Sequence, residues 1–301
     1  MENNQNEVIK IAGTHLGKVG GEGYKDTYDP GLLVAIPRHF NRESYGIKEG
    51  DLPFIGGDVW NAYEVSGLTE KGLPVSGMMK IYYRCDSPLH VESKSIKLYL
   101  NSFNMTKLGQ SAKECKELIE GMVAKDLSEA LQTDVKVKFF LNDLSPEIEF
   151  GEDYLELDQL VNLDEIEFNT FKSDAGQLKV NNNAGGAVKI KSNLLRSNCR
   201  VTNQPDWGDV YIHLEGSNVP DYESLAKYIV SHRQVSHFHE EICEMVFTHL
   251  MEAYNPSKLM VTCLYTRRGG LDINPIRATH MDMIPGMFTD VNYRNKKTLR
   301  Q

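Results

Sequence analysis

Two stretches of this chain repeat one order of hydrophobic periods: strand, strand, helix, strand. In the first stretch, residues 79–85 and 95–103 alternate apolar and polar side chains and therefore predict strands. A helix is predicted over residues 111–131, followed by a strand over residues 134–141. The expected apolar stripe of this helix comprises Leu118, Ile119, Met122 and Val123.

The second stretch follows the same order with an added helix. Strands are predicted over residues 194–201, 208–216 and 258–266, and helices over residues 221–233 and 238–254. This order favours two α+β units over a parallel array in which each strand is followed by a helix.

The segment between the two stretches differs from both in composition. Residues 147–167 are acidic and irregular, and residues 181–187 (NNNAGGA) are rich in turn formers. We therefore predict an N-terminal module over residues 1–150 that begins with a loop-rich extension. A connecting region over residues 151–187 and a C-terminal module over residues 188–301 would follow.

Charge and composition narrow the functional classes. The 301 residues carry a formal net charge of −9, which disfavours broad binding to nucleic acid and makes small-molecule chemistry the better hypothesis. The N-terminus lacks the apolar region of a signal peptide, and no run of about 18 apolar residues predicts a membrane span. The five scattered cysteines form neither a disulfide framework nor a CxxC pair, so we expect a reduced, cytoplasmic protein.

One of these cysteines lies in an unusual setting, the stretch SNCRVTNQPDWG. A free cysteine usually packs among apolar residues, whereas Cys199 stands between Asn198 and Arg200. It is either incidental to a loop or a thiol that must be reached. Asp206, beyond a proline-containing turn, would not lower the pKa of a thiol by its charge. It could accept the thiol proton and return it later.

The stretch SHFHEE introduces the helix predicted over residues 238–254. Ser236 is the expected N-cap, and His239 and Glu240 are expected in the first turn, where side chains often face a pocket. A capping segment with solvated charges is the alternative. A zinc site of His237, His239 and Cys243 is a weaker one, because the spacing is not HExxH. The expected buried stripe is Ile242, Met245, Val246 and Leu250.

Two further stretches carry clustered cations. Glu92, Lys94 and Lys97 stand at the start of the strand predicted over residues 95–103, where lysines ordinarily discourage edge-to-edge pairing. Residues 266–270 (TRRGG) place two arginines beside two glycines, a pattern that suits an anion site but also a solvated turn. No GxGxxG follows a predicted strand, so a dinucleotide would not bind through that fingerprint.

Taken together, ESKSIKLYLNSFN, SNCRVTNQPDWG, FHEE and YTRRGGLDINP closely resemble the NADPH-dependent 7-cyano-7-deazaguanine reductases, the nitrile reductases of queuosine biosynthesis. DTYDPGLL, IPRHFNR and LPFIGGDVWNAYE resemble the two-module branch. The resemblance implies an α+β fold of two tandem tunnelling-fold (T-fold) modules, antiparallel sheets each backed by a pair of helices, and a homodimer. Residues 147–183 do not match the family pattern, and Arg200 stands where an apolar residue is expected.

The resemblance also implies catalytic roles. Cys199 would add to the nitrile carbon to give a covalent thioimide, with Asp206 as the general acid/base and His239 exchanging protons. Two molecules of NADPH would complete the four-electron reduction to 7-aminomethyl-7-deazaguanine.

Binding roles follow from the same resemblance. Glu92 and Glu240 would read the base, since carboxylates suit the ring N–H and amino donors of a deazaguanine. The substrate pocket would comprise His90 and Val91 (by their backbone), Glu92, Phe238, His239 and Glu240. The NADPH contacts would comprise Ser93, Lys94, Ser95, Arg267, Arg268 and Gly269. No metal ligand set is expected.

Two rivals remain at this stage. One is a hydrolytic enzyme of the same fold, which would need zinc to activate water. The other is a binder of purines or tRNA that has lost catalysis. The net charge argues against tRNA, and the Cys199 and Asp206 pair argues against lost catalysis.

Overall fold

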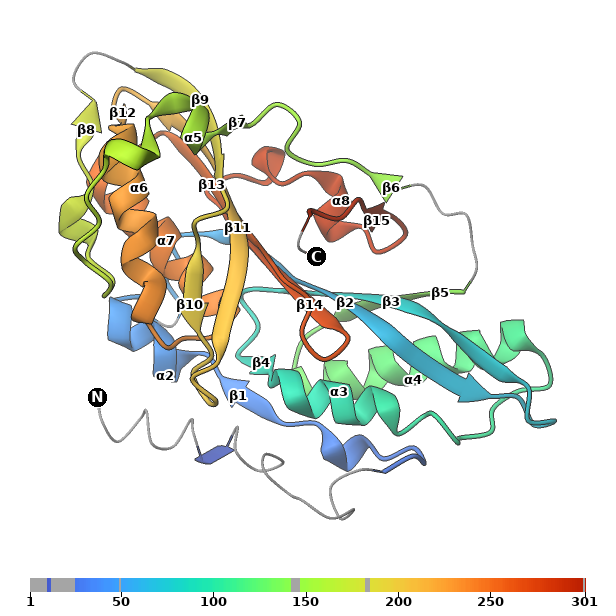
Figure 1. Cartoon of the computed structure of the whole chain (residues 1–301). Helices are drawn as coiled ribbons and strands as arrows, with labels where there is room; N and C mark the ends of the chain where they lie inside the picture. Colours follow the sequence, from blue (N-terminus) through green and yellow to red (C-terminus); the bar gives the residue numbers. More distant parts are fainter. Residues whose placement is uncertain (1–9, 12–24, 49, 142–146, 182–184, 300) are drawn as a thin grey trace.

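The structure is a computed structural model, and it describes residues 10–11, 25–48, 50–141, 147–181, 185–299 and 301. Within them, nine strands form one sheet in the order β5-β3-β2-β14-β13-β11-β9-β7, with β10 paired to β11 (Figure 1). All its pairings are antiparallel except β7 with β9. The strands are β2 (Ile55–Leu68), β3 (Pro74–Arg84), β5 (Val135–Phe140), β7 (Leu155–Glu156), β9 (Gly186–Ser192), β10 (Arg196–Asn198), β11 (Pro205–Gly216), β13 (Lys258–Tyr265) and β14 (Leu271–Ala278).

The smaller elements flank this sheet. Three two-stranded pairs are β1 (Ala35–Pro37) with β4 (Leu89–Val91), β8 (Val180–Asn181) with β12 (Val219–Pro220), and β6 (Glu147–Ile148) with β15 (Arg294–Asn295). The α-helices are α2 (His39–Arg42), α3 (Ser93–Asn101), α4 (Ala112–Leu131), α5 (Leu157–Leu160), α6 (Tyr222–Ser231), α7 (His239–Tyr254) and α8 (Gly286–Thr289). Short 3₁₀ turns are η2 (Pro30–Leu32), η3 (Glu43–Tyr45), η4 (Leu163–Glu165), η5 (Ala175–Gln177), η6 (His232–Gln234) and η7 (Met281–Met283).

Two pairs of helices cover one face of the sheet. α3 and α4 pack on β2, β3 and β5 around a core that includes Ile96, Tyr99 and Ile119. α6 and α7 pack on β9, β11 and β13 around a second core that includes Ile229 and Phe247. The chain is thus a mixed α+β fold in which each half contributes antiparallel strands and two helices.

The halves share one sheet because β14 of the second half pairs with β2 of the first, from Leu271 opposite Ala62 to Ala278 opposite Ile55. Glycine is required here: a Cβ on Gly56 would lie 2.1 Å from the carbonyl oxygen of Ile276, and Gly56 has a φ of +138°. The sequence analysis predicted neither β2 nor β14, and so it did not foresee a continuous sheet.

Buried ion pairs reinforce the same junction. Asp58 on β2 pairs with Arg38 and with Arg277 of β14, and Glu244 of α7 pairs with Arg42 and Arg277. All five side chains are buried. We call these five residues the junction cluster. It ties the segment before β2, both central strands and α7 into one body.

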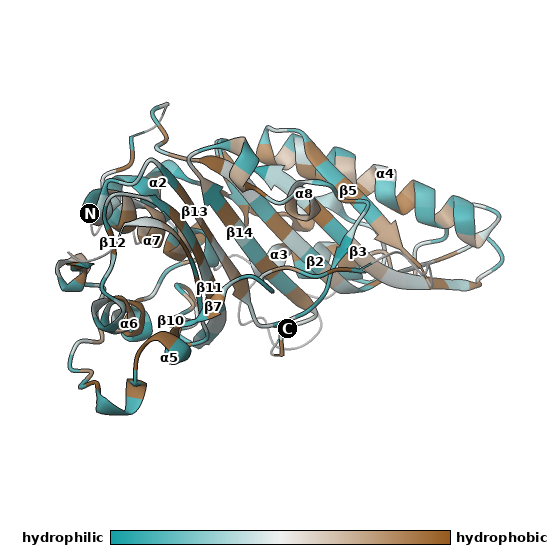
Figure 2. Ribbon diagram, turned by 90° about the horizontal axis from the view of Figure 1, so that it is seen from above, coloured by the Kyte–Doolittle hydropathy of each residue, from teal (hydrophilic) through white to brown (hydrophobic). Residues whose placement is uncertain are grey.

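The second face of the sheet is covered by the C-terminal segment. In Figure 2, seen from above, α8 lies over the strands, whose hydrophobic and hydrophilic bands alternate. Phe288 of α8 packs against Phe150 in an apolar cluster that also holds Tyr211 and Met260. Lys80 of β3 is fully buried here, and its ammonium donates to the carbonyls of Met287, Asp290 and Tyr293. Burial lowers its pKa to about 8.

The helix predicted over residues 111–131 is confirmed as α4. The Ser111 hydroxyl accepts a hydrogen bond from the backbone N–H of Glu114, which satisfies one free donor of the first turn. The predicted stripe is wrong in part: Leu118 is 40% exposed, and Met122 is half-buried. The buried row follows a spacing of four residues: Cys115, Ile119, Val123, Leu127 and Leu131.

The strand predicted over residues 95–103 is wrong, because this segment is the helix α3 and its following turn. Its buried residues Ile96, Tyr99 and Leu100 follow helical spacing. The Glu92 carboxylate begins the helix by accepting from the backbone N–H groups of Lys94 and Ser95. Lys94 therefore belongs to a helix N-terminus and does not protect a sheet edge.

Most other predicted elements are confirmed with shifted ends. The strand expected over 194–201 is only Arg196–Asn198, and α7 has Phe238 as its N-cap in place of the predicted Ser236. The region assigned as a connection joins the second half: β7 pairs with β9, and Leu157 is buried in the core under α6 and α7. No helix among the described residues is both long and apolar enough to span a bilayer.

Candidate active site

A cavity of about 520 Å³ opens where the two halves meet. Its walls come from the start of α3, the start of α7, the turn between β10 and β11, and the turn between β13 and β14. The predicted site residues that line it are Val91, Glu92, Ser93, Lys94, Cys199, Asp206, Phe238, His239, Glu240, Arg268 and Gly269. Residues distant in sequence and drawn from both halves therefore share one site.

Cys199 reaches this cavity because of a tight turn. Its backbone N–H donates to the carbonyl of Gln204 at 2.8 Å, and the N–H of Asn203 donates to the Cys199 carbonyl at 2.9 Å. Asn203 takes the left-handed conformation that closes the turn, at a φ of +54°. Cys199 is half-buried, whereas the other four cysteines are buried.

The polar neighbours of Cys199 do not face water. Arg200 is 8% exposed, and its guanidinium donates to Glu241 at 2.9 Å and to the side chain of Asn41. The backbone of Asn198 is bonded to Val235 and His237. The thiol is therefore reached because of the turn, while its neighbours Asn198 and Arg200 are bonded within the protein. Arg200 joins the second half to the segment before β2.

Asp206 lies at the start of β11 with its carboxylate turned into the cavity wall. Its Oδ2 lies 3.3 Å from Nε2 of His239, and its Oδ1 accepts from the guanidinium of Arg268. Burial would raise the pKa of this carboxyl, but the hydrogen bond and charge of His239 and the charge of Arg268 hold it below its ordinary value. Asp206 therefore rests as a carboxylate able to accept a proton.

His239 is held in place by stacking. Its ring lies 3.9 Å from that of Tyr265 on β13, at an angle of 14°. One ring nitrogen faces Asp206, while Nδ1 is buried without a hydrogen-bond partner. The two nitrogens therefore face different surroundings, and a ligand or water is needed to satisfy Nδ1.

The two glutamates of FHEE have separate roles. Glu241 caps α7 by accepting from the N–H of Phe238, and it also binds Arg200 and His237. Burial alone would raise the pKa of Glu241, but His237 and then Arg200 lower it below its ordinary value. Glu240 is 3% exposed and lines the cavity, yet its Oε1 accepts no hydrogen bond. The nearest polar group to this oxygen is Nδ1 of His90 at 3.8 Å, beyond hydrogen-bond distance, so Glu240 can still accept from a ligand that brings a donor.

Glu92 faces the cavity from the first half. Its two oxygens accept from the backbone N–H groups of Lys94 and Ser95, at 2.9 and 2.7 Å. Burial is the leading cause that raises its pKa, against these hydrogen bonds. A carboxylate has about four lone-pair sites, so Glu92 can cap α3 and still accept from a ligand.

Cations gather at the opposite rim. Lys94 is exposed at the start of α3, and Arg268 and Gly269 face it from the turn after β13. Lys97 also lines the cavity, although it was not among the predicted cofactor contacts. Gly269 has a φ of +55°, and a Cβ there would lie 3.1 Å from the Lys97 ammonium. The absence of a side chain therefore lets Lys97 pack directly against the backbone of this turn.

Three predicted residues do not line the cavity. His90 lies behind Glu240, with its Nδ1 3.8 Å from Glu240 Oε1. The hydroxyl of Ser95 is buried and donates to the carbonyl of Glu92. The guanidinium of Arg267 stacks on the ring of Tyr63 at 3.5 Å.

The weaker zinc alternative is not supported by the geometry. Cys243 is buried, with its sulfur against the carbonyls of Val261 and Pro275, so it does not meet His237 and His239. Over the part of the chain that is described, no group of three or more His, Cys, Asp or Glu could hold a metal ion.

Comparison with known proteins defines the class as the nitrile reductases. A family model described as the N-terminal part of the nitrile reductase 7-cyano-7-deazaguanine reductase matches residues 24–139. A second model, described as QueF-like protein, matches residues 205–283. The two models cover the two halves that meet at the cavity.

Similar proteins narrow the class to one family. The NADPH-dependent 7-cyano-7-deazaguanine reductase of Hahella chejuensis is 43% identical over 89% of this chain and 93% of its own length. That of Colwellia psychrerythraea is 37% identical over 95% and 98%. This chain belongs to the family of NADPH-dependent 7-cyano-7-deazaguanine reductases. A solved archaeosine synthase QueF-Like matches 32% of this chain at 21% identity and a TM-score of 0.30, too distant to carry an argument.

Proposed function

We propose that this chain reduces the nitrile of 7-cyano-7-deazaguanine to the amine of 7-aminomethyl-7-deazaguanine with NADPH, in tRNA queuosine biosynthesis. Cys199 carries the substrate as a covalent thioimide. The observation that supports this most is one cavity holding a reachable thiol, an ionised Asp206 and an unpartnered carboxylate oxygen on Glu240. Family membership supplies the identity of the substrate and the cofactor.

The first step is proton transfer coupled to addition. The Asp206 carboxylate takes the proton of the Cys199 thiol, and the sulfur forms a bond to the nitrile carbon. One π bond of the nitrile breaks, and its nitrogen takes the proton back from Asp206. The thioimide that results contains all the atoms of thiol and nitrile, so this step needs no other reactant.

The chain can also orient the base and exclude water. Glu240 and Glu92 accept from the donors on the polar edge of the deazaguanine. Phe238 lies beside them and offers an aromatic face to the base. His239, ordered by its stacking on Tyr265, exchanges protons with Asp206 and with the nitrogen that becomes the amine.

The rim of the cavity fits the cofactor. Lys94, Lys97 and Arg268 line the rim beside Gly269, and clustered cations suit phosphate groups. NADPH, when bound, supplies one hydride, and the reduction of each nitrile consumes two molecules of NADPH. Arg267 could contribute only after leaving Tyr63, so we assign it no direct contact in this state.

We further propose that the halves are tandem T-fold modules over residues 1–150 and 188–301, with residues 151–187 packed on the second module, and that the chain acts as a homodimer on a small molecule without nucleic acid. Two antiparallel strands followed by two helices occur in each half, which supports the modules. Sedimentation at micromolar concentration tests the dimer.

Oxidation of NADPH with and without 7-cyano-7-deazaguanine tests the function. We expect oxidation only with the nitrile present, two NADPH per amine formed, and a strong preference for NADPH over NADH because arginine binds the extra phosphate well. Equal use of both nicotinamides would contradict the assignment. A zinc-dependent hydrolase would instead consume the substrate without NADPH and lose activity with a chelator.

A further inference from the structure

Arg268 occupies a position that neither its cofactor role nor the general acid/base role of Asp206 explains. Its guanidinium donates from Nη1 to Asp206 Oδ1 and from Nη2 to the side chain of Gln204 at 3.2 Å. Cys199 lines the same cavity and helps to raise the pKa of Arg268. The residue predicted to hold a cofactor phosphate is therefore engaged by the two groups of the addition step.

The contact is open to exchange. The Arg268 side chain is 38% exposed, whereas that of Asp206 is 4% exposed. Gly269 and Gly270 follow Arg268 with φ values of +55° and +79°, so the turn that carries the arginine is built on glycine. The other cations of the cavity, Lys94 and Lys97, lie on the same rim and suit an anionic group. A short movement of one side chain would exchange Asp206 for an anion at the rim.

We propose that Arg268 is a positioning residue that keeps Asp206 ionised for addition of the thiol, and that cofactor binding withdraws Arg268 so that Asp206 can act as an acid in the reduction that follows. This inference rests on the proposed function. In this proposal, Arg268 couples the binding of the cofactor to the protonation state of Asp206.

The chemistry requires both states of Asp206. Addition begins with the carboxylate, because the thiol proton needs an acceptor, whereas each reduction delivers hydride to carbon and needs a proton at nitrogen. Among the described residues, His239 from α7 and Arg268 from the turn after β13 pair with Asp206, Tyr265 from β13 feels its charge, and Cys199 lines the same cavity. Arg268 is the one of these with a permanent positive charge.

The charges agree with this assignment. Burial would lower the pKa of Arg268, but the charge of Asp206 and the hydrogen bond to it, followed by Cys199, raise it above its ordinary value. The same pair lowers the pKa of Asp206. Withdrawal of Arg268 leaves burial opposed by His239 alone, so the pKa of Asp206 rises and its protonated form becomes accessible.

The test follows thioimide formation by intact mass in rapid-quench samples, without NADPH, from pH 5 to pH 8. The carboxylate is the reactive form, so a raised pKa of Asp206 moves the acid loss of rate to higher pH. The wild-type carboxylate has a pKa below 3.8 and stays ionised at pH 5, so the wild type should keep its rate within about twofold between pH 8 and pH 5. Arg268→Gln should lose rate over this range, by about tenfold for each unit by which burial raises the pKa of Asp206 above the pH. Arg268→Lys, which keeps the charge, should stay within about twofold of the wild type.

Addition of saturating NADP⁺, which delivers no hydride, tests the withdrawal. In the wild type it should move the acid loss of rate to higher pH, as Arg268→Gln does, and in Arg268→Gln it should add nothing. A wild-type profile unmoved by NADP⁺, or an equal movement in Arg268→Gln, overturns the inference. If the wild type forms no adduct at all, the proposed mechanism fails instead, so the two failures are distinguishable.

Discussion

Two groups of arginines and carboxylates lie where the halves meet. In the junction cluster, every carboxylate is paired: Asp58 faces Arg277 at 2.9 Å, and Glu244 faces Arg42 at 2.7 Å. In the cavity, by contrast, Asp206 shares a half-exposed Arg268, and Glu240 leaves one oxygen without a partner.

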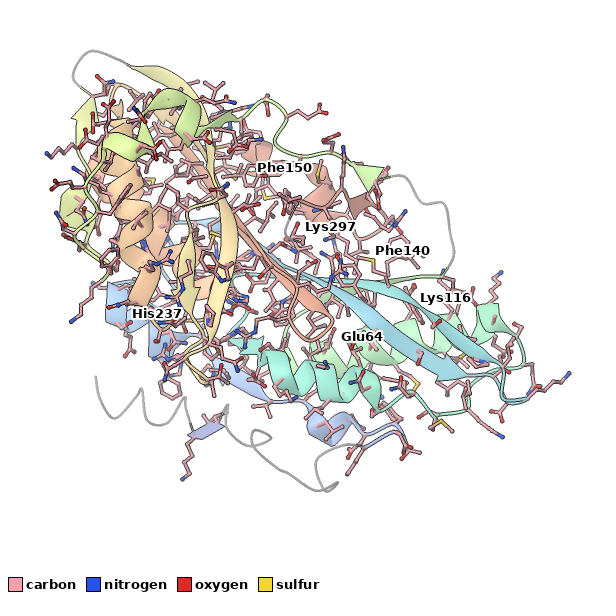
Figure 3. All side chains as sticks on the ribbon, viewed as in Figure 1. Glu64, Lys116, Phe140, Phe150, His237 and Lys297 are labelled. Atoms are coloured by element: carbon pink, nitrogen blue, oxygen red, sulfur yellow. The ribbon has the colours of Figure 1, made fainter. Side chains whose placement is uncertain are left out.

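Both groups consist of arginines and carboxylates. They differ in burial and pairing, because the junction cluster is buried with every carboxylate paired and the cavity group is not. Figure 3 places His237, close to the cavity, on the helix-covered side of the sheet, and Phe150 and Lys297 on the side covered by the C-terminal segment. The junction cluster lies inside the body and holds the halves together, so removing a partner should cost stability. The cavity group keeps exchangeable contacts and unmet acceptors, so removing a partner should cost activity or binding.

The largest expected effect is on adduct formation by the cavity group. Cys199→Ala should give no adduct by intact mass and no NADPH oxidation, because no other described cysteine lines the cavity. Asp206→Asn should slow adduct formation by roughly 10²–10⁴-fold, the usual contribution of general acid–base assistance. As a control, Cys115→Ala alters a buried cysteine of the first half and should form the adduct normally. Reduction that persists in Cys199→Ala would disprove the covalent route.

The next largest effect concerns the junction cluster. Glu244→Gln leaves Arg42 buried without its carboxylate and Arg277 with Asp58 alone, and should lower the free energy of unfolding by about 3–5 kcal/mol. Urea denaturation measures this. The folded fraction should retain its rate of adduct formation. A loss of rate without a loss of stability would show that the two groups are not separate in function.

The same variant should change the acid stability. Burial alone would raise the pKa of Glu244, but Arg277 and Arg42 hold it well below its ordinary 4.5. For a carboxyl with a depressed folded pKa, the stabilisation is complete above pH 4.5 and is lost as the pH falls below it. Stability measured from pH 6 to pH 3 should therefore fall more steeply in the wild type than in Glu244→Gln.

Binding of the base should show a smaller effect. In a Cys199→Ala background, Glu240→Leu should weaken substrate binding by roughly 1–3 kcal/mol in isothermal titration, the usual cost of an unpaired buried polar group. Glu92→Leu should weaken binding similarly and also lower stability by about 1 kcal/mol, because it removes the cap of α3. Unchanged binding in Glu92→Leu would leave Glu92 as a cap alone.

The smallest effect should come from an exposed pair of the same chemistry. Arg84 and Asp86 pair at 2.5 Å with side chains 65% and 47% exposed. Arg84→Gln should change the free energy of unfolding by less than about 1 kcal/mol, because water screens the pair. A larger change would mean that burial does not explain the difference between the junction cluster and the cavity group.

The site was more predictable from sequence than the fold. Motif identity was enough to bring Cys199, Asp206, His239 and Glu240 into one cavity. Periodicity failed at α3, because SIKLYL alternates like a strand while its buried residues have helical spacing. The cue for a helix was Glu92, whose carboxylate begins α3, but a glutamate is an unusual cap.

Other features depend on contacts that no local pattern carries. The role of Arg200 depends on Asn41, 159 positions away, and on Glu241 in the next helix. β14 follows polar TRRGG, and its apolar and polar residues alternate only as far as Asn274 before Pro275 breaks the phase, yet all its residues are buried. Its polar side chains are matched by partners on β2 and α7, which sequence periodicity does not show.

The burial of Lys80 has a consequence for the order of events during synthesis. Its first acceptor, the carbonyl of Met287, lies 207 positions further along the chain. At typical rates of translation, roughly 10–40 s pass between the two. Over that interval the ammonium of β3 has none of its carbonyl ligands, and one side of the first half's strands is bare. Emergence of residues 287–293 from the ribosome therefore completes the packing of the half that was made first.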